Sequence, residues 1–258
     1  MMADPRTLST VQRTLEVLKS FSADRPEWGV TELADKLGVH KSQVHRALAT
    51  LSAEGFLVPN PVSRKYRLGP ALVRLGMIAG ESGGVPQLVQ PVLERLAMQM
   101  GETVVFNLAA EAEYVMRAAA DGPGAIRFAL TLNRRFPWYG GACGHAIFAH
   151  RSEDEINSLL NGGFTHSTQS GPHTREDILR RHAAVREHGF AVSIGEYDEK
   201  IMSVAVPVRL DSDVIGSVGV VGVPALLAGR ETQLAEELMA ATDMLAEQLS
   251  SGTPLPVA

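Results

Sequence analysis

The sequence predicts an α+β protein in two parts, an N-terminal winged helix-turn-helix followed by a larger α+β domain. Three observations predict it: two short helices meet at a glycine and lead into a basic hairpin, helices then alternate with antiparallel hairpins, and the two parts differ in charge. Residues 1–70 hold 10 Lys and Arg against 7 Asp and Glu, whereas residues 71–258 hold 14 against 22. We expect a winged domain over 6–68, a linker helix over 69–84 and a second domain over 85–252.

The composition is that of an ordinary folded protein with enough residues for two cores. The chain has 258 residues, of which 45% are hydrophobic and 21% are charged. It contains no long uncharged apolar run, and its N-terminus lacks the apolar core of a signal peptide, so we expect no membrane association. The single cysteine excludes an internal disulfide and fits a reducing compartment, which predicts a cytoplasmic protein.

The helix-turn-helix is predicted from apolar spacing. A first helix is expected over Leu8–Phe21, and 22–29 is expected to be a loop. Ala34, Gly38 and Val44 then follow the pattern of two helices that cross closely over a short turn. In this pattern the small residue leaves room for the second helix, and the glycine takes the left-handed conformation that ends the first.

The second helix and the hairpin carry the expected DNA contacts. No acidic residue occurs from 40 to 53, and a helix in a major groove would offer Gln43 and Arg46 to base edges. The hairpin over 56–68 ends with three cations, which favour phosphate contact. The expected DNA-binding residues are Lys41, Ser42, Gln43, His45 and Arg46 on the helix and Arg64, Lys65 and Tyr66 on the hairpin. The alternative is a solvated helix and loop.

The rest of the chain predicts a linker and a sheet domain. A short apolar helix over 70–79, which we expect to pack against a partner subunit, ends at a glycine-rich break over 80–86. Further helices are expected over 85–100, 140–149, 153–160, 174–188 and 231–249, and strands over 103–109, 114–119, 126–132, 190–194, 203–209 and 214–221. Helices interleaved with antiparallel hairpins form an α+β domain, a common arrangement for enclosing a small molecule.

Five motifs in this order resemble the IclR family of bacterial transcription regulators. They are Tyr66-Arg67-Leu68-Gly69-Pro70, Gly101-Glu102-Thr103, Gly144-His145-Ala146, Gly189-Phe190-Ala191-Val192 followed by Glu196, and Ala205-Val206-Pro207-Val208. The resemblance covers roughly residues 6–250. It implies a homodimer or dimer of dimers on double-stranded operator DNA. It also implies a GAF/PAS-like C-terminal domain that binds a small effector, often a carboxylic acid or an aromatic catabolite.

The resemblance also implies where an effector binds. The positions that match the family's effector pocket are Ala142, Cys143, Gly144, Ser193, Ser203, Val220 and Gly222. The residues themselves support the first pair, because Gly140 and Gly141 leave backbone N–H groups at a helix N-terminus, which favour an anion. Acid-binding members commonly carry an acidic or hydroxyl group where Ser193 and Val220 stand, and often Cys where Ser203 stands. Fewer fixed polar groups predict a larger or more apolar ligand.

Cys143 and the histidines near it could have roles other than lining a pocket. Cys143 and His145 could be a nucleophile and a base, but they lie ~200° apart on a helix, so their pairing needs a non-helical turn. His145 and His150 lack the spacing of a helical metal pair, although Cys143 and His145 could form a loop site. His166 and His173 flank a polar loop.

Two further alternatives stay open. Arg134 and Arg135 are either pocket cations or part of a solvated turn. The predicted function is a DNA-binding transcriptional regulator controlled by an organic or aromatic acid, with no catalytic residue, metal or cofactor. The alternative is an enzyme or sensor with an appended winged-helix interaction domain.

Overall fold

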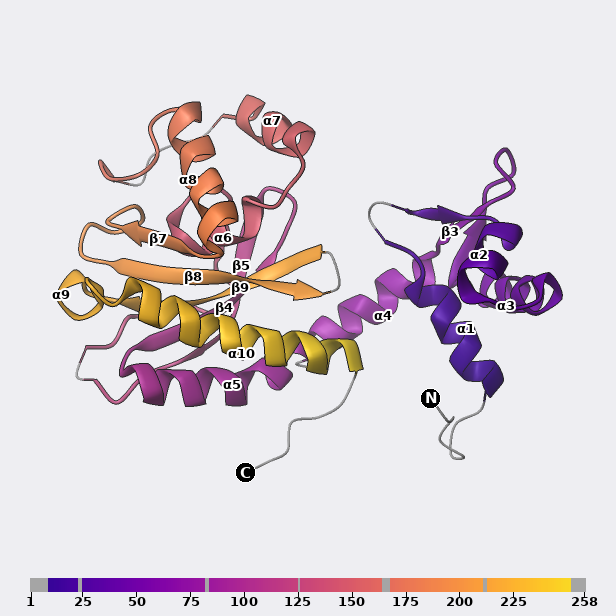
Figure 1. The fold of residues 1–258 in the computed structure, drawn as a ribbon, viewed down its shortest axis with the longest axis horizontal. Coiled ribbons are helices and arrows are strands. Elements are labelled where there is room, and N and C mark those ends of the chain that lie inside the picture. The colour runs from indigo at the N-terminus through magenta and orange to yellow at the C-terminus, as the bar shows by residue number, and fades with distance from the viewer. Residues whose placement is uncertain are drawn as a thin grey trace. The chain divides into compact units, whose positions relative to one another are not determined.

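The computed structural model describes residues 9–22, 25–81, 84–124, 126–163, 168–210 and 213–251 (Figure 1). The chain divides into two compact units, with the division between Gly83 and Gly84. Within the described residues, no helix combines the length and hydropathy needed to cross a membrane.

The first unit contains a helix-turn-helix and a wing. Its elements are α1 (Ser9–Lys19), β1 (Glu27–Trp28), α2 (Val30–Leu37), α3 (Lys41–Ala53), β2 (Leu57–Pro59), β3 (Tyr66–Leu68) and α4 (Pro70–Glu81). The three strands form an antiparallel sheet in the order β1-β3-β2. As predicted, Gly38 is left-handed with φ +64°, and Val44 of α3 is buried against Ala34 and its neighbours in one core.

The second unit is built on a six-stranded antiparallel sheet. Its elements are α5 (Gly84–Met100), β4 (Thr103–Ala109), β5 (Glu113–Ala120), β6 (Arg135–Pro137), α6 (Gly141–Phe148), α7 (Glu153–Asn161), α8 (Arg175–His188), β7 (Ala191–Ile194), β8 (Met202–Leu210), β9 (Asp213–Gly222), α9 (Pro224–Leu227) and α10 (Glu231–Ser251). The strand order is β6-β5-β4-β9-β8-β7.

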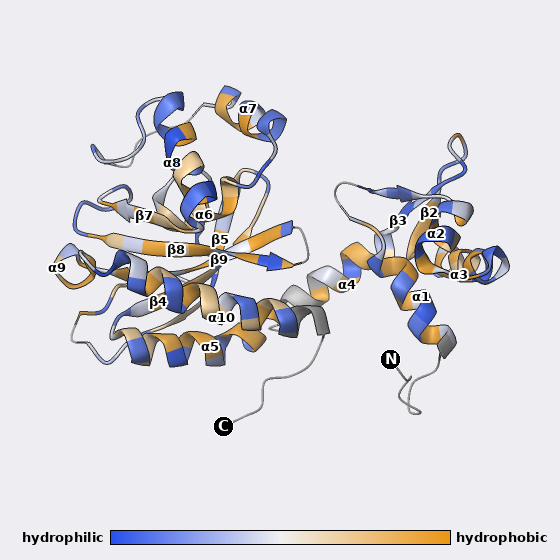
Figure 2. Cartoon of the chain, in the orientation of Figure 1, coloured by the Kyte–Doolittle hydropathy of each residue, from blue (hydrophilic) through white to orange (hydrophobic). Residues whose placement is uncertain are grey.

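Helices cover both faces of this sheet. α5 and α10 lie on one face and α6 with α8 on the other (Figure 1). Because side chains alternate along a strand, Val104 and Phe106 pack toward α5 and α10, whereas Val105 packs toward α6. The strands are largely hydrophobic, and the outer helices carry hydrophilic residues as well (Figure 2). Every residue of α6 is buried, so its N-terminus lies inside the unit.

Three expectations from the sequence are wrong. The loop over 22–29 contains strand β1, whose residues pair with Arg67 and Tyr66 of β3. The strand over 126–132 does not form; the described residues there are irregular, and the edge strand is β6. The break over 80–86 is shorter, because α4 continues to Glu81 and α5 begins at Gly84. Leu8 and His166 lie outside the described residues.

The failed strand has a physical explanation. Its apolar residues alternate as in a strand, but two of them, Ile126 and Leu132, are 46% and 52% exposed. The chain rejoins the sheet only at Asn133, whose N–H donates to the Met116 carbonyl at 2.7 Å. Residues 128–131 line a cavity instead of pairing with β5.

Candidate functional site

One face of α3 carries the predicted DNA contacts. Val44, Leu48 and Leu51 are buried, whereas the residues on the other side face solvent. Lys41, Ser42, His45 and Arg46 are exposed, and Gln43 is half-buried. Gln43 and Arg46 also line a groove of about 300 Å³ shared with Thr10, Arg13 and Thr14 of α1. The structure thus brings the five helix residues onto one accessible stretch of α3.

The three predicted wing residues differ from one another. Arg64 is exposed and has a left-handed φ of +57°. Lys65 is engaged, because its Nζ donates to Glu32 Oε1 at 2.9 Å. Tyr66 is half-buried and packs on the core of the first unit. Only one of the three is therefore an exposed cation in the described structure.

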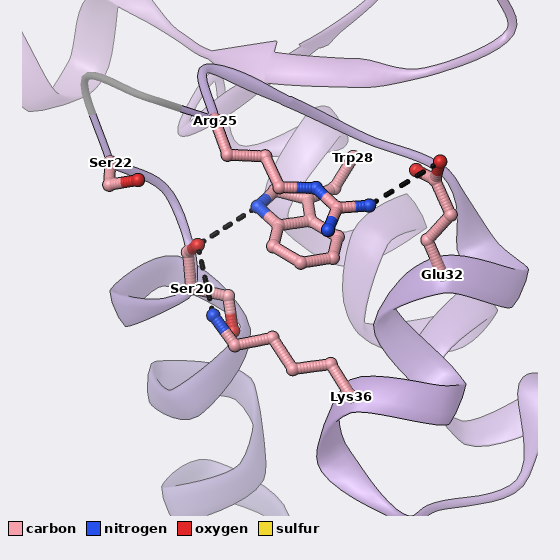
Figure 3. Close-up of a pocket in the computed structure, with 6 residues that line it drawn as sticks. All are labelled: Ser20, Ser22, Arg25, Trp28, Glu32 and Lys36. Atoms are coloured by element: carbon pink, nitrogen blue, oxygen red, sulfur yellow. Dashed lines mark hydrogen bonds and ion pairs between the residues drawn. The ribbon is translucent and has the colours of Figure 1, made fainter.

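A tryptophan fixes the segment that leads into α2 (Figure 3). Trp28 is 3% exposed, and its Nε1 donates to the Ser20 carbonyl at 2.9 Å. The Arg25 guanidinium lies 3.6 Å from the ring centroid and Lys36 Nζ 4.8 Å from it. Arg25 also pairs with Glu32 at 3.5 Å. A single tryptophan in a short polar segment gives no periodic signal, so the sequence alone does not reveal this site.

A cavity of about 320 Å³ lies beside the N-terminus of α6, over the sheet. Apolar and aromatic side chains make up most of its wall, among them Val105, Tyr114, Met116, Phe128, Leu130, Phe136 and Val221. Four of the predicted effector residues line it: Ala142, Cys143, Ser193 and Ser203. Ser193 and Ser203 also share a hydrogen bond at 3.0 Å.

The other three predicted effector residues do not line this cavity. Val220 is fully buried on the α5 and α10 side of the sheet, and its neighbour Val221 lines the cavity instead. Gly144 faces the Trp138 carbonyl, which a Cβ would approach to 2.8 Å. Gly222 faces Leu227 and Glu102, each 3.0 Å from where its Cβ would stand. Strand alternation and the turn of α6 therefore separate these residues from their sequence neighbours.

The two arginines left open by the sequence have different surroundings. Arg134 lines the cavity, and its Nη2 donates to the Tyr197 hydroxyl. Its guanidinium lies 5.3 Å from the Phe136 ring centroid and 5.2 Å from that of Tyr197. Arg135 does not line the cavity and pairs with Glu113 at 2.9 Å. The cavity therefore has one guanidinium at its exposed edge.

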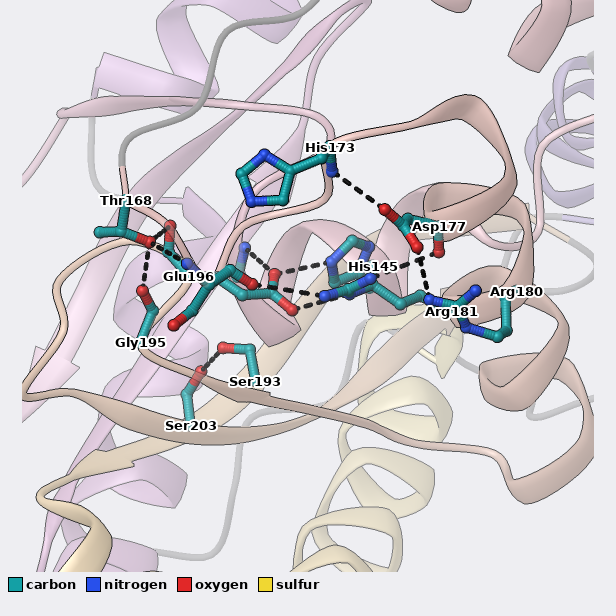
Figure 4. Close-up of polar contacts among 12 residues, drawn as sticks. His145, Thr168, His173, Asp177, Arg180, Arg181, Ser193, Gly195, Glu196 and Ser203 are labelled. Atoms are coloured by element: carbon teal, nitrogen blue, oxygen red, sulfur yellow. Dashed lines mark hydrogen bonds and ion pairs between the residues drawn. The ribbon is translucent and has the colours of Figure 1, made fainter.

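The N-terminus of α6 already holds an anion, the carboxylate of Glu196 (Figure 4). Glu196 Oε2 accepts from the Gly141 N–H at 3.1 Å and contacts His145 Nε2 at 2.8 Å. Oε1 accepts from Arg181 Nε at 2.9 Å. Burial acts to raise the pKa of Glu196, but His145 and then Arg181 outweigh it, so the pKa lies below its ordinary value. The Gly141 N–H at this helix N-terminus is therefore already paired within the protein.

The geometry does not pair Cys143 with His145. His145 is directed at Glu196, and burial raises the pKa of the Cys143 thiol to about 11, which keeps it protonated at neutral pH. His173 donates its backbone N–H to Asp177. No group of three or more His, Cys, Asp or Glu suited to a metal ion is found among the described residues.

A cation-bearing helix on a winged unit and a ligand-sized cavity in a second unit define a class of protein, the ligand-responsive transcriptional regulators. Residues 10–61 match the IclR helix-turn-helix domain, and residues 80–250 match the C-terminal domain of the bacterial transcriptional regulator IclR. The chain belongs to the IclR family, and it is a DNA-binding transcriptional regulator with a C-terminal effector domain.

Similar proteins share both parts. The HTH-type transcriptional regulator XynR of Escherichia coli (strain K12) is 31% identical over 202 residues, which cover 78% of this chain and 80% of XynR. A solved IclR transcriptional regulator from Alicyclobacillus acidocaldarius is 29% identical with a TM-score of 0.61, covering 93% of this chain and 98% of that one. An IclR homolog from Microbacterium hydrocarbonoxydans, complexed with 4-hydroxybenzoate, has a TM-score of 0.61 at 20% identity and covers 94% and 100%. At that identity the likeness shows the common fold.

Proposed function

We propose that the cavity beside α6 binds a small aromatic acid and that this ligand controls binding to operator DNA. The observation that carries the proposal is Arg134, a guanidinium at the edge of a mainly apolar cavity and beside the rings of Phe136 and Tyr197. A flat apolar ligand would pack against such rings, and its carboxylate would pair with the guanidinium. Because Glu196 occupies the Gly141 N–H, Arg134 is the better anchor for the acid.

The size of the cavity and its remaining polar groups restrict the class of ligand that it can bind. Its volume of about 320 Å³ is at the small end of ligand pockets, which span about 300–1,000 Å³, so a single ring is favoured. Ser193 and Ser203 offer hydroxyls to a polar substituent. Asp198 also lines the cavity and would repel a second acidic group. The ligand that we propose is therefore a monocarboxylate with one aromatic ring.

Thermal unfolding with added acids tests the ligand class. Benzoate and 4-hydroxybenzoate should raise the melting temperature of the full chain more than lactate or glycolate, since a ligand at a hundred times its Kd stabilises by about 2.7 kcal/mol. Arg134→Ala should abolish the shift, and Arg135→Ala, which changes the neighbouring cation outside the cavity, should retain it. If only the small hydroxy acids raised the melting temperature, the aromatic-acid proposal would be wrong.

We also propose that Arg46 and Gln43 read base edges while Lys41 and Ser42 contact phosphates. The support is that these four residues lie on one accessible stretch of α3, where Gln43 is half-buried and the other three are exposed, and that the first turn of α3 has no acidic residue. Arg46→Ala should relax base preference in selection from a random duplex pool and weaken the best sequence by about 1–3 kcal/mol. The control is Arg95→Ala, an exposed arginine of α5, which should change neither. If Arg46→Ala kept the base preference of the wild type, the assignment of α3 as the recognition helix would be wrong.

We further propose that the chain acts as a homodimer or dimer of dimers, with α4 at an interface. Val73, Leu75 and Ile78 of α4 are 66%, 44% and 50% exposed, which is unfavourable for a helix left in water. Light scattering should give a smaller mass for Ile78→Glu and an unchanged mass for Arg74→Glu on the same helix. A monomeric wild type would contradict the proposal.

We infer that the protein acts as a regulator without enzyme activity. The relatives are named as transcriptional regulators, and the one cysteine of the chain is held as a neutral thiol. This inference would be contradicted if mass spectrometry showed that the protein chemically converts an acid that raises its melting temperature.

A further inference from the structure

Two carboxylates attach the wing to the helix-turn-helix. Glu27 of β1 accepts hydrogen bonds from Asn60 Nδ2 at 3.0 Å and from Ser63 Oγ at 3.2 Å, one on each oxygen. Glu32, in the first turn of α2, accepts from Lys65 Nζ at 2.9 Å. The turn between β2 and β3 is therefore held at two points by residues of the preceding strand and helix.

The turn itself is organised by the residue that Glu27 holds. Asn60 Oδ1 accepts from the N–H groups of Val62 at 3.0 Å and Ser63 at 3.2 Å. Its backbone N–H donates to the Lys65 carbonyl at 2.7 Å. Asn60 thus uses one end of its amide to fix the turn and the other end to bind Glu27, so the carboxylate determines where the wing tip lies.

These carboxylates oppose the electrostatics of DNA binding. A negative charge beside a phosphate-binding surface weakens binding to a polyanion, so their placement calls for another role. Both are ionised at neutral pH. The Asn60 hydrogen bond chiefly lowers the pKa of Glu27, and the Gly29 N–H and then Lys65 lower the pKa of Glu32.

We propose that Glu27 and Glu32 are positioning residues for DNA binding, which hold the wing so that Arg64 meets the phosphate backbone while Lys65 serves as a strut. The Lys65 ammonium is engaged by Glu32. Arg64 is exposed at the turn and forms no ion pair with the residues that the structure describes. Its left-handed φ of +57° is a strained conformation for arginine, which the anchored turn maintains.

The sign of a charge-removing substitution separates positioning from electrostatics. The probe is the duplex most enriched by the full-length wild type from a random-sequence pool. Glu32→Gln removes a negative charge, so electrostatics alone predicts tighter binding, whereas loss of the strut predicts binding about two- to fivefold weaker. Asp35→Asn removes the same charge from the exposed side of α2 and should bind as tightly as wild type or more tightly.

Salt dependence separates a strut from a phosphate contact. Arg64→Ala should lower the slope of log K against log salt concentration by about 0.9, the value for one lost phosphate contact. Lys65→Gln should weaken binding and leave the slope unchanged. The double variant Glu32→Gln/Lys65→Gln should lose no more affinity than Glu32→Gln alone, because Lys65 acts through its contact with Glu32.

The opposite results would overturn the proposal. One is that Glu32→Gln binds the duplex as tightly as Asp35→Asn does. The other is that Lys65→Gln lowers the salt slope as much as Arg64→Ala does. Ser63→Ala removes one of the two hydrogen bonds to Glu27 without changing charge, together with the bond that the same hydroxyl accepts from the Lys65 N–H. Wild-type affinity in that variant would remove the Ser63 contact with Glu27 from the proposal. Thermal unfolding of each variant verifies the fold, and the salt slope of Lys65→Gln decides the role of Lys65 if Glu32→Gln does not fold.

Discussion

Replacing Glu196 with Gln tests the polar network that holds the start of α6. The carboxylate meets three donors, the Gly141 N–H at 3.1 Å, His145 Nε2 at 2.8 Å and Arg181 Nε at 2.9 Å. Glutamine has the same shape, but its NH₂ group cannot accept a hydrogen bond, so at least one of the three donors loses its acceptor. Its amide is also neutral, which leaves the charge of Arg181 uncompensated. A hydrogen bond to a charged group contributes about 1.5–3 kcal/mol, and Glu196 is 6% exposed, so we expect a loss of about 2–4 kcal/mol.

Urea unfolding of the second unit measures this loss. The chain has two tryptophans, Trp28 in the first unit and Trp138 in the second, so Trp28→Phe leaves a fluorescence signal from the second unit alone. Glu199→Gln, an exposed carboxylate on the same loop, is the matched control and should change stability by less than about 0.5 kcal/mol. A loss below about 1 kcal/mol for Glu196→Gln would refute the network's role in holding α6.

The pH dependence gives a second test. Because the pKa of Glu196 in the fold lies below its ordinary value of 4.5, its contribution is present above that pH and is lost as the pH falls further. The stability difference between wild type and Glu196→Gln should therefore shrink below about pH 4.5. If the stability difference between wild type and Glu196→Gln stayed constant down to about pH 3, the charge of Glu196 would not be the source of its stabilising effect.

Three other predictions concern buried positions. With a thiol pKa of about 11 instead of 9.0, Cys143 should react with iodoacetamide at pH 8 about a hundredfold more slowly than a free cysteine, and labelling at the free rate, seen by mass spectrometry, would contradict its burial. Gly144→Ala should cost about 1–3 kcal/mol in urea unfolding, because its Cβ would stand 2.8 Å from the Trp138 carbonyl oxygen. Leu234→Ala should cost about 2–5 kcal/mol, whereas Met244→Ala, which is 46% exposed on the same helix, should cost much less.

Local patterns predicted much of the fold. The pattern of Ala34, Gly38 and Val44 predicted the crossing of α2 and α3, in which Ala34 and Val44 are buried. The helix expected over 174–188 is α8, which begins with a capping box between Thr174 and Asp177. Gly38 ended α2 in the left-handed conformation as expected. These features depend on neighbours within one or two turns, so the sequence carries them directly.

Features that depend on distant partners could not be predicted in this way. Strand β1 has two residues and no periodicity, and it forms because Trp28 meets Tyr66. The Glu196 carboxylate reaches the Gly141 N–H across 55 positions of sequence. The cavity wall at Phe128 has the apolar alternation of a strand but no strand partner. In each case packing in three dimensions decided an outcome that local preference left open.

The affinity of the full chain for its selected duplex, with and without the aromatic acid that raises its melting temperature most, tests the coupling between cavity and DNA most directly. We expect saturating acid to change the Kd by about fivefold or more in wild type and to leave it unchanged in Arg134→Ala. The ligand-free affinity of Arg134→Ala should equal that of wild type. An acid that stabilises the protein through Arg134 and yet leaves the wild-type Kd unchanged would contradict the account.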